Sequence, residues 1–354
     1  MSTLILPVAG NSSRFPGTRP KFLLTHPSGR PMLVKAVDGL LANQSFDSII
    51  VVGLKEHEQQ YNCFNSLCDE IRCTCLDLGH TVKCFKFLLD QPTQNQPETI
   101  VKVTEALRIT GQIVIKDCDN YFEISEMLAG NFVGTYDLSK LSQVNAGNKA
   151  YVQFGKSGEI VNIVEKKVIG DKFCCGVYGF RDACEFVDYY HKLSIYPNLY
   201  ISHIIYNMIL HGSTFFAKDV SEYIDWGTME DWNRFVNQYV ALFIDIDGVL
   251  VESSAKHFDP KWGTTKGIQE NVDRINALYK SGKYQIILTT TRDESFRAVT
   301  SKQLEDVGLL HYDELIMGLP HCKRVLINDF SNSNSYPSAI AINVPRNGKL
   351  GGLL

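Results

Sequence analysis

Residues 4–15 have the sequence LILPVAGNSSRF, an apolar run that leads directly into a loop of small and polar residues. The apolar part is typical of a buried strand, and small residues let backbone N–H groups approach an anion closely. Arg14 and the nearby Lys21 could offset negative charge beside this loop. The stretch therefore predicts a strand followed by a candidate phosphate-binding loop, although an ordinary turn shares the pattern.

Short apolar runs alternate with helical patterns over the first two-thirds of the chain. We expect strands at Leu4–Val8, Ile49–Gly53, Lys83–Leu89, Gln112–Lys116, Ala150–Phe154 and Phe173–Phe180. Apolar residues recur at helix spacing between the first two strands, at Leu33, Ala36, Val37, Leu40 and Leu41. This alternation predicts an α/β fold class with a mostly parallel sheet.

A second α/β series begins near Val240. Strands are expected at 241–244, Tyr284–Thr289, Val325–Asn328 and Ala339–Val344, with a helix at Ile268–Lys280. The 354 residues suit two domains, because a domain usually has ~100–200 residues. We place the boundary within Asn237–Ala241, which gives one domain at 1–238 and a second, smaller one at 240–354.

The composition argues against several classes of partner. A net charge of -4 gives no basic surplus, so nucleic acid is not expected as a partner. The N-terminus lacks a signal-peptide pattern and no apolar run is long enough for a membrane span, so we expect a soluble cytoplasmic protein without a membrane partner. The ten cysteines include no C-x-x-C pair, which favours reduced, packed thiols over zinc or disulfides.

Carboxylates follow another of the apolar runs. Residues 113–119 have the sequence IVIKDCD, which places Asp117 and Asp119 at the end of a buried strand, and Asp225 begins the later sequence DWGT. Hard oxygen ligands suit Mg²⁺, which bridges phosphates while two carboxylates hold it. In the alternative interpretation, Asp117 is a helix cap or a salt-bridge partner.

Several landmarks follow one another along this part of the chain. They are the loop at 7–14 with RPKFLL at 19–24, TQNQPET at 93–99, the aspartates at 117 and 119, VEKK at 164–167 with GVYGF at 176–180, and DWGT at 225–228. With them, residues 1 to about 238 resemble the sugar-phosphate nucleotidyltransferases. The resemblance implies a Rossmann-like domain that transfers a nucleotidyl group from a nucleoside triphosphate to a sugar phosphate and releases pyrophosphate. The loop is shorter than the glycine-rich loop of many members, which leaves the base open, with CTP or UTP favoured.

The same resemblance implies roles for individual residues. Gly10, Ser12 and Ser13 would cradle the triphosphate, while Arg14 and Lys21 would stabilise the displacement at the α-phosphorus. Asp119 and Asp225 would hold Mg²⁺. Gln96 and Glu98 would lie near the base, and Glu165 and Lys166 would face the acceptor.

Residues 241–250, ALFIDIDGVL, are the strongest local signal in the sequence. A buried strand ends in Asp245 and Asp247, which are two residues apart and share a face, so both could meet one metal. Asp245 could attack phosphorus to form an aspartyl-phosphate, with Asp247 as general acid and base. In the structural alternative, Asp247 caps a turn.

Two further strand ends follow in order, IILTTTR at 286–292 and VLIND at 325–329. With them, residues 240–354 resemble the capless haloacid-dehalogenase-type phosphatases, a second Rossmann-like fold. The resemblance implies that Thr290 binds phosphate, that Thr291 and Arg292 contact the substrate, and that Asp329 is a third Mg²⁺ ligand beside Asp245 and Asp247. The Gly-Lys-Pro often seen in that family is Gly-Leu-Pro at 318–320, so Leu319 stands where the family has its lysine. Lys323 is the nearest substitute.

Three hypotheses follow. The first is a bifunctional enzyme of activated-sugar synthesis that supplies a surface polysaccharide such as capsule. In this hypothesis the phosphatase acts first, on a sugar bisphosphate, and the rival order, in which the transferase acts first, stays open. A homo-oligomer is compatible with it. The second is an active transferase with a non-catalytic regulatory or assembly domain at the C-terminus. The third is a nucleic-acid end-processing protein, which the missing basic surplus and the missing G-x-x-x-x-G-K-[ST] loop disfavour.

Overall fold

The computed structural model describes residues 2–10, 12–141, 146–196, 198–333 and 337–352. Asn11 of the quoted loop lies outside these residues. The chain divides into two compact units, Met1–Trp232 and Asn233–Leu354. The division falls inside helix α7 (Met229–Val236), a little before the boundary that the sequence predicts.

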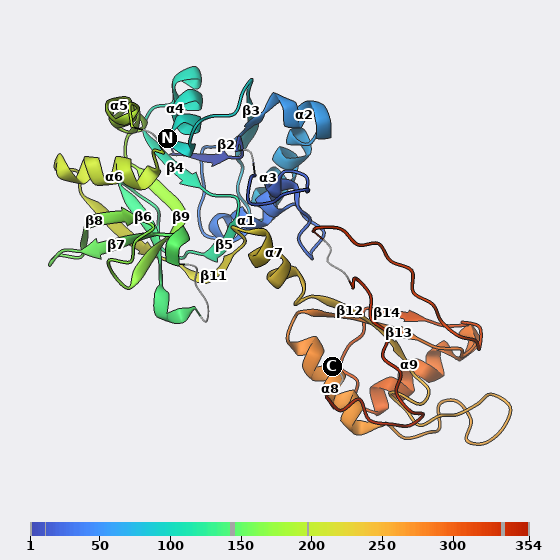
Figure 1. Cartoon of the computed structure of the whole chain (residues 1–354). Coiled ribbons are helices and arrows are strands. Elements are labelled where there is room, and N and C mark those ends of the chain that lie inside the picture. The colour runs from blue at the N-terminus through green and yellow to red at the C-terminus, as the bar shows by residue number, and fades with distance from the viewer. Residues whose placement is uncertain (1, 11, 142–145, 197, 334–336, 353–354) are drawn as a thin grey trace. The chain divides into compact units, whose positions relative to one another are not determined.

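Within the described residues of the first unit, nine strands form one sheet in the order β3-β2-β1-β4-β9-β6-β10-β8-β7 (Figure 1). They are β1 (Ser2–Pro7), β2 (Ser48–Leu54), β3 (Lys83–Leu89), β4 (Gln112–Lys116), β6 (Phe132–Asp137), β7 (Ala150–Phe154), β8 (Glu159–Glu165), β9 (Lys172–Phe180) and β10 (Phe215–Asp219). The strands β3, β2, β1 and β4 are parallel neighbours. Beyond β4 most pairings are antiparallel, so the prediction of a mostly parallel sheet is wrong for that half. The physical reason is visible at β7 and β8, because a tight turn can join only antiparallel neighbours.

Helices cover both faces of this sheet. They are α1 (Met32–Leu41), α2 (Lys55–Tyr61), α3 (Phe64–Asp77), α4 (Gln96–Leu107), α5 (Ala183–Leu193) and α6 (Ile201–Leu210), with 3-10 turns η1 (Lys21–Leu23), η2 (Leu138–Lys140) and η3 (Ala146–Asn148). Helices α1 and α3 pack into one hydrophobic cluster, and α4, α5 and α6 pack into another. No helix in the described part of the chain is long and apolar enough to cross a bilayer.

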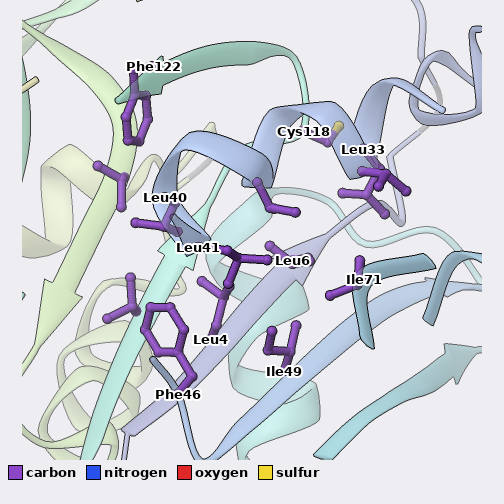
Figure 2. Packing of buried hydrophobic residues seen from close by; sticks show 14 of the residues in the cluster. Leu4, Leu6, Leu33, Leu40, Leu41, Phe46, Ile49, Ile71, Cys118 and Phe122 are labelled. Atoms are coloured by element: carbon purple, nitrogen blue, oxygen red, sulfur yellow. The ribbon is translucent and has the colours of Figure 1, made fainter. Parts of the chain in front are cut away.

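Strand β1 explains why both faces need covering. Leu4, Ile5 and Leu6 are all fully buried, and alternate residues of a strand point to opposite faces. Leu4 and Leu6 join the cluster under α1 and α3, which Figure 2 shows with Leu33, whereas Ile5 joins the cluster under α4. The apolar run therefore fixes the middle of the sheet and directs the loop after β1 outward.

The six strands predicted for this unit are confirmed, as is the predicted helix at α1. The sequence missed β6, β8 and β10, and also a separate antiparallel pair formed by β5 (Asn120–Glu123) and β11 (Ser221–Asp225). The short β5 and β11 carry polar residues on both sides, which hides the period-two pattern of a half-buried strand. This pair of strands positions Asp225 in the candidate site.

The second unit has a small parallel sheet in the order β12-β13-β14. Its elements are β12 (Val240–Asp245), α8 (Gln269–Lys280), β13 (Tyr284–Thr289), η4 (Glu294–Phe296), α9 (Arg297–Asp306) and β14 (Glu314–Ile316). The predicted strands at 241–244 and Tyr284–Thr289 and the predicted helix between them are confirmed. A single cluster, which includes Ile244, Leu288 and Leu304, forms the core.

Two strands predicted for the second unit, Val325–Asn328 and Ala339–Val344, are wrong. Val325, Leu326 and Ile327 have strand-forming side chains, but all three are exposed. A strand is stable only when its backbone is paired and one of its faces is buried, and the segment meets neither condition here. The segment is therefore apolar in sequence but does not form a strand.

Gly39 provides a test of the packing in the first unit. A Cβ at this position in α1 would overlap the carbonyl oxygen of Phe122 in β5. Alanine favours a helix over glycine by about 1 kcal/mol, but an overlap with backbone cannot be relieved by a rotamer change. We expect Gly39→Ala to lower the free energy of unfolding by about 1–3 kcal/mol in denaturant titration.

Gly10→Ala is the matched control, because a Cβ on Gly10 would meet nothing within 4 Å. This control should change the free energy of unfolding by less than about 1 kcal/mol. Equal stability of the Gly39→Ala protein and the wild type would show that α1 is not seated against β5 as described.

Candidate functional site

Two aspartates from distant parts of the chain converge at the carboxyl end of β4. Asp119 lies in the turn between β4 and β5, directly before Asn120, and β11 pairs with β5 so that Asp225 lies opposite Asn120. The backbone N–H of Trp226 also donates to the carbonyl oxygen of Asp119 at 2.9 Å. The missed β5–β11 pair is thus the device that brings Asp225 beside Asp119.

Gly227 shows that the two carboxylates border one space. A Cβ on this residue would lie 3.0 Å from Asp225 Oδ1 and 3.8 Å from Asp119 Oδ2. Only a glycine leaves that space open. Two carboxylates around an open space fit Mg²⁺, which commonly takes one or two protein carboxylates and completes its shell with water and substrate phosphate. The residues present therefore fit the metal that the sequence predicts.

Two cations form ion pairs with the carboxylate of Asp119. Lys21 Nζ lies 2.6 Å and Arg14 Nη2 3.3 Å from its Oδ2. Burial alone would raise the pKa of the Asp119 carboxyl, but the ammonium and the guanidinium together hold it well below its usual range. Asp119 is therefore an anion ready to ligate a metal, with its cations facing the same space.

The loop after β1 delivers these two cations. The backbone N–H of Lys21 donates to Ser12 Oγ at 3.2 Å, and Ser12 adopts a positive φ of 48° that turns the chain. Gly10 and Ser13 are exposed. The predicted triphosphate-binding residues Gly10, Ser12 and Ser13 thus lie on the loop that carries Arg14 and Lys21 to Asp119.

A third cation was missed by sequence reasoning. Lys149 Nζ lies 2.5 Å from Asp225 Oδ2 and donates to the hydroxyl oxygen of Tyr223 at 2.7 Å. It precedes β7 and belongs to none of the motifs, so no signal in the sequence marked it. The pair of carboxylates is therefore flanked by cations on two sides.

Lys116 stabilises the turn between β4 and β5 through hydrogen bonds from its side chain. Its ammonium is fully buried and donates to Asn120 Oδ1 and to the carbonyl oxygen of Asp117, both at 2.7 Å. Burial lowers the pKa of Lys116 to about 8. A lysine that ends a buried strand beside two aspartates was a visible signal, which the sequence reasoning did not use.

Gln96 contacts the turn that follows β4. Its amide donates to Asp117 Oδ1 at 2.5 Å, so it holds the turn after β4. Burial raises the pKa of the Asp117 carboxyl, and the negative charge of Asp119 raises it further. In this arrangement the amide of Gln96 donates to Asp117, and its position near the base stays a prediction.

Glu98 likewise has a structural role. It accepts from the backbone N–H of Gln94 at 2.7 Å and pairs with Lys102, while its own N–H donates to the side chain of Asn95, the N-cap of α4. These are the contacts that stabilise a helix start. Glu98 therefore has a capping role in the structure, and its position near the base stays a prediction.

Glu165 and Lys166 lie at the end of β8 and on the rim near Lys149. Glu165 pairs with Ala150 in β7, and the N–H of Lys166 donates to the carbonyl oxygen of Lys149 at 2.8 Å. Their side chains contact the start of α6, because Ser202 donates to Glu165 and Lys166 donates to Tyr200, each at 2.7 Å. The predicted acceptor residues thus share one edge with Lys149.

In the second unit, Asp245 and Thr289 end neighbouring parallel strands and lie opposite each other. The cation that pairs with Asp245 is Arg324, whose Nη2 lies 3.5 Å from Oδ1, and not the predicted Lys323, which is exposed. Burial raises the pKa of the Asp245 carboxyl, and Arg324 opposes that rise. Asp245 thus ends its strand opposite Thr289, and its cation is Arg324.

Asp247 and Arg292 form an ion pair in the second unit. Arg292 is fully buried and donates to both oxygens of Asp247 at 2.8 Å, while Thr300 and Gln303 accept its remaining Nη1 bonds. Thr290 also donates to Asp247, at 3.4 Å. Arg292 therefore holds Asp247, whose oxygens also accept from Ser254 at 3.1 Å and from Thr290. In this arrangement the guanidinium faces Asp247, which differs from the substrate contact predicted for Arg292. Thr291 lies beside them, half-buried.

The predicted Mg²⁺ site of the second unit is not assembled. Asp329 follows an exposed coil instead of the predicted strand. Within the residues that the structure describes, no group of three or more His, Cys, Asp or Glu side chains could hold a metal. The residues present at Asp245 therefore do not fit the three-carboxylate metal site.

Comparison with known proteins bears on the first unit. No protein-family profile and no curated protein matches the chain. A nucleoside-diphosphate-sugar pyrophosphorylase from Vibrio cholerae superposes with a TM-score of 0.52 and 17% identity, over 66% of this chain and 99% of that one. A protein assigned as a glucose-1-phosphate thymidylyltransferase from Bacillus anthracis, solved with sucrose, gives 0.50 and 20%, over 66% and 94%. The N-terminal two-thirds of the chain therefore has the fold of the sugar nucleotidyltransferases.

Proposed function

We propose that the first unit transfers a nucleotidyl group from a nucleoside triphosphate, with CTP or UTP favoured, to a sugar phosphate. The observation that carries this proposal is the convergence of Asp119 and Asp225 around one open space, with Arg14 and Lys21 delivered to it by the loop after β1. Carboxylates that hold a divalent metal and cations that face phosphate are what in-line displacement at phosphorus requires.

The chemistry needs positioning more than proton transfer. An oxygen of the acceptor's phosphate is already a nucleophile, so it attacks the α-phosphorus while the bond to pyrophosphate breaks. Arg14 and Lys21 take up the negative charge that moves onto the pyrophosphate. Mg²⁺ bound by Asp119 and Asp225 would neutralise and orient the phosphates. The product would be an activated sugar, of the kind that supplies surface polysaccharides such as capsule.

For the second unit we propose hydrolysis of a phosphomonoester at Asp245. The supporting observation is the pairing of Asp245 with Thr289 at one sheet edge, beside the cation Arg324. An oxygen of Asp245 would attack phosphorus, the ester bond would break, and water would then release phosphate from the aspartyl-phosphate. Asp247 cannot supply the leaving group's proton while Arg292 holds both of its oxygens.

That last contact favours a second candidate for the same unit, a non-catalytic regulatory or assembly domain. A carboxylate saturated by a fully buried guanidinium is a structural feature, and removal of either partner would leave an unpaired buried charge. The two candidates differ in one measurable property, which is whether the wild-type chain releases phosphate at all.

We expect Asp119→Asn and Asp225→Asn each to lower nucleotidyl transfer by at least about a hundredfold, because an amide is a poor ligand for a divalent metal. The measurement is pyrophosphate release with each of four nucleoside triphosphates and a panel of sugar 1-phosphates. Asp219→Asn is the control, since Asp219 forms an ion pair with Lys172 outside the site. Transfer by both variants at the wild-type rate would exclude this site.

We expect Asp245→Asn to abolish phosphate release from an aryl phosphate without unfolding the chain, because an amide has the same shape but cannot attack phosphorus. Thr290→Ala should raise the barrier by about 1–3 kcal/mol, the usual cost of one lost hydrogen bond to a charged group. Asp293→Asn, at an exposed cap of η4, is the control. Absence of release by the wild type would leave the non-catalytic candidate in place.

A further inference from the structure

Among the described residues, Lys149 is the cation at the carboxylate pair to which the proposed mechanism gives no task. Its side chain is largely buried, and its ammonium lies over the rings of Tyr223 and Phe173, 5.3 Å and 5.8 Å from their centres. Its charged partner is Asp225, at 2.5 Å. A buried lysine on a metal ligand must move aside or share that ligand when a metal binds.

The topology places Lys149 on the acceptor side of the site. In the sheet, β4 has β1 on one side and β9 on the other, and β9 also pairs with β7, which Lys149 precedes. The loop after β1 brings Arg14 and Lys21, which serve the triphosphate in the proposed reaction. Lys149 comes from the opposite side, where its carbonyl oxygen accepts from Lys166 and its neighbour Ala150 pairs with Glu165.

Electrostatics then determines what happens to this ammonium. A divalent cation competes with a monovalent one for Asp225 and also repels it at short range, so the Asp225–Lys149 pair is weakened when the metal enters. Tyr223, the other partner of the ammonium, accepts one hydrogen bond through its hydroxyl oxygen and offers no carboxylate. An ammonium displaced within a poorly solvated site needs a new anion nearby.

Resting on the proposed transfer reaction, we propose that Lys149 binds the phosphate group of the acceptor, and that Asp225 holds its ammonium until metal and acceptor replace that pair. The acceptor phosphate is the anion that must enter this side of the site, with an oxygen directed at the α-phosphorus. Lys149 would orient it as a point charge and transfer no proton, because the phosphate attacks as an anion.

The first test uses metal alone. Mn²⁺ is titrated into the full chain without nucleotide, and free Mn²⁺ is followed by its electron paramagnetic resonance signal. Lys149→Met should tighten Mn²⁺ binding by at least about threefold, because the competing ammonium is gone. Asp225→Asn reports Mn²⁺ bound elsewhere in the chain. Lys172→Met, which removes a lysine from an ion pair outside the site, should leave the affinity unchanged.

The second test separates the two substrates. Lys149→Met should raise KM for the sugar phosphate by at least about tenfold and change KM for the nucleoside triphosphate by less than about twofold, as expected for the loss of one charged contact to a single substrate. Lys149→Arg should recover part of the acceptor affinity because it keeps the charge. If Lys149→Met does not fold, Lys149→Gln takes its place with the same expectations.

The results distinguish failure of this inference from failure of the proposed function. Unchanged or weaker Mn²⁺ affinity, or an equal rise of both KM values, would overturn the role of Lys149 while transfer itself stands. Absence of transfer by the wild type would instead remove the proposed function. In that case calorimetric binding of glucose 1-phosphate in the presence of Mg²⁺ decides, with weaker binding to Lys149→Met supporting the inference and equal binding overturning it.

Discussion

The candidate site of the first unit depends on two carboxylates, Asp119 and Asp225, being brought close together where β11 pairs with β5. Like charges held near each other repel, and the repulsion grows as their separation falls. Asp119 and Asp225 are tolerated at one space because Lys21, Arg14 and Lys149 each lie within ion-pair distance of one of them. The cations are thus required by the fold before any substrate arrives, and the same cations are what a triphosphate and a phosphate acceptor need.

The backbone around this pair is arranged to maintain the convergence. The β5–β11 pairing fixes the position of Asp225, and the fully buried Lys116 ties the turn that presents Asp119 to Asn120. Gly227 completes the arrangement, because any side chain there would fill the space between the carboxylates. Apolar strands build the sheet, but polar contacts of single residues position the site at its edge.

The sequence predicted the parts of this site that carry a local pattern. A buried strand that ends in carboxylates indicated Asp119, and a loop of small residues followed by two cations indicated Arg14 and Lys21, in each case from residues alone. The joint role of Asp119 and Asp225 on one metal came from the family resemblance. Lys149 could not be predicted, because its contact with Asp225 depends on a long-range pairing of strands. The capping role of Glu98 was predictable, because Asn95 three residues earlier completes a capping pattern. The family resemblance instead led to the prediction that Glu98 lies near the nucleotide base. In the second unit, residues 325–328 have the pattern of a strand but lie exposed, because a local pattern does not supply a partner strand.

The cations paired with Asp119, Asp245 and Asp247 differ in how exposed they are to solvent. Arg14 is 52% exposed and Arg324 45%, so each can leave its aspartate for an incoming phosphate at the cost of a weak, solvated ion pair. Arg292 is 0% exposed and makes two further hydrogen bonds to Thr300 and Gln303, so its departure from Asp247 would leave several buried groups unpaired. Asp119 and Asp245 are thus each paired with at least one exposed cation, although Lys21, the nearer partner of Asp119, is only 20% exposed. The guanidinium paired with Asp247 is buried, so the phosphatase activity proposed for the second unit would need a proton donor other than Asp247 or a rearrangement that exposes Arg292.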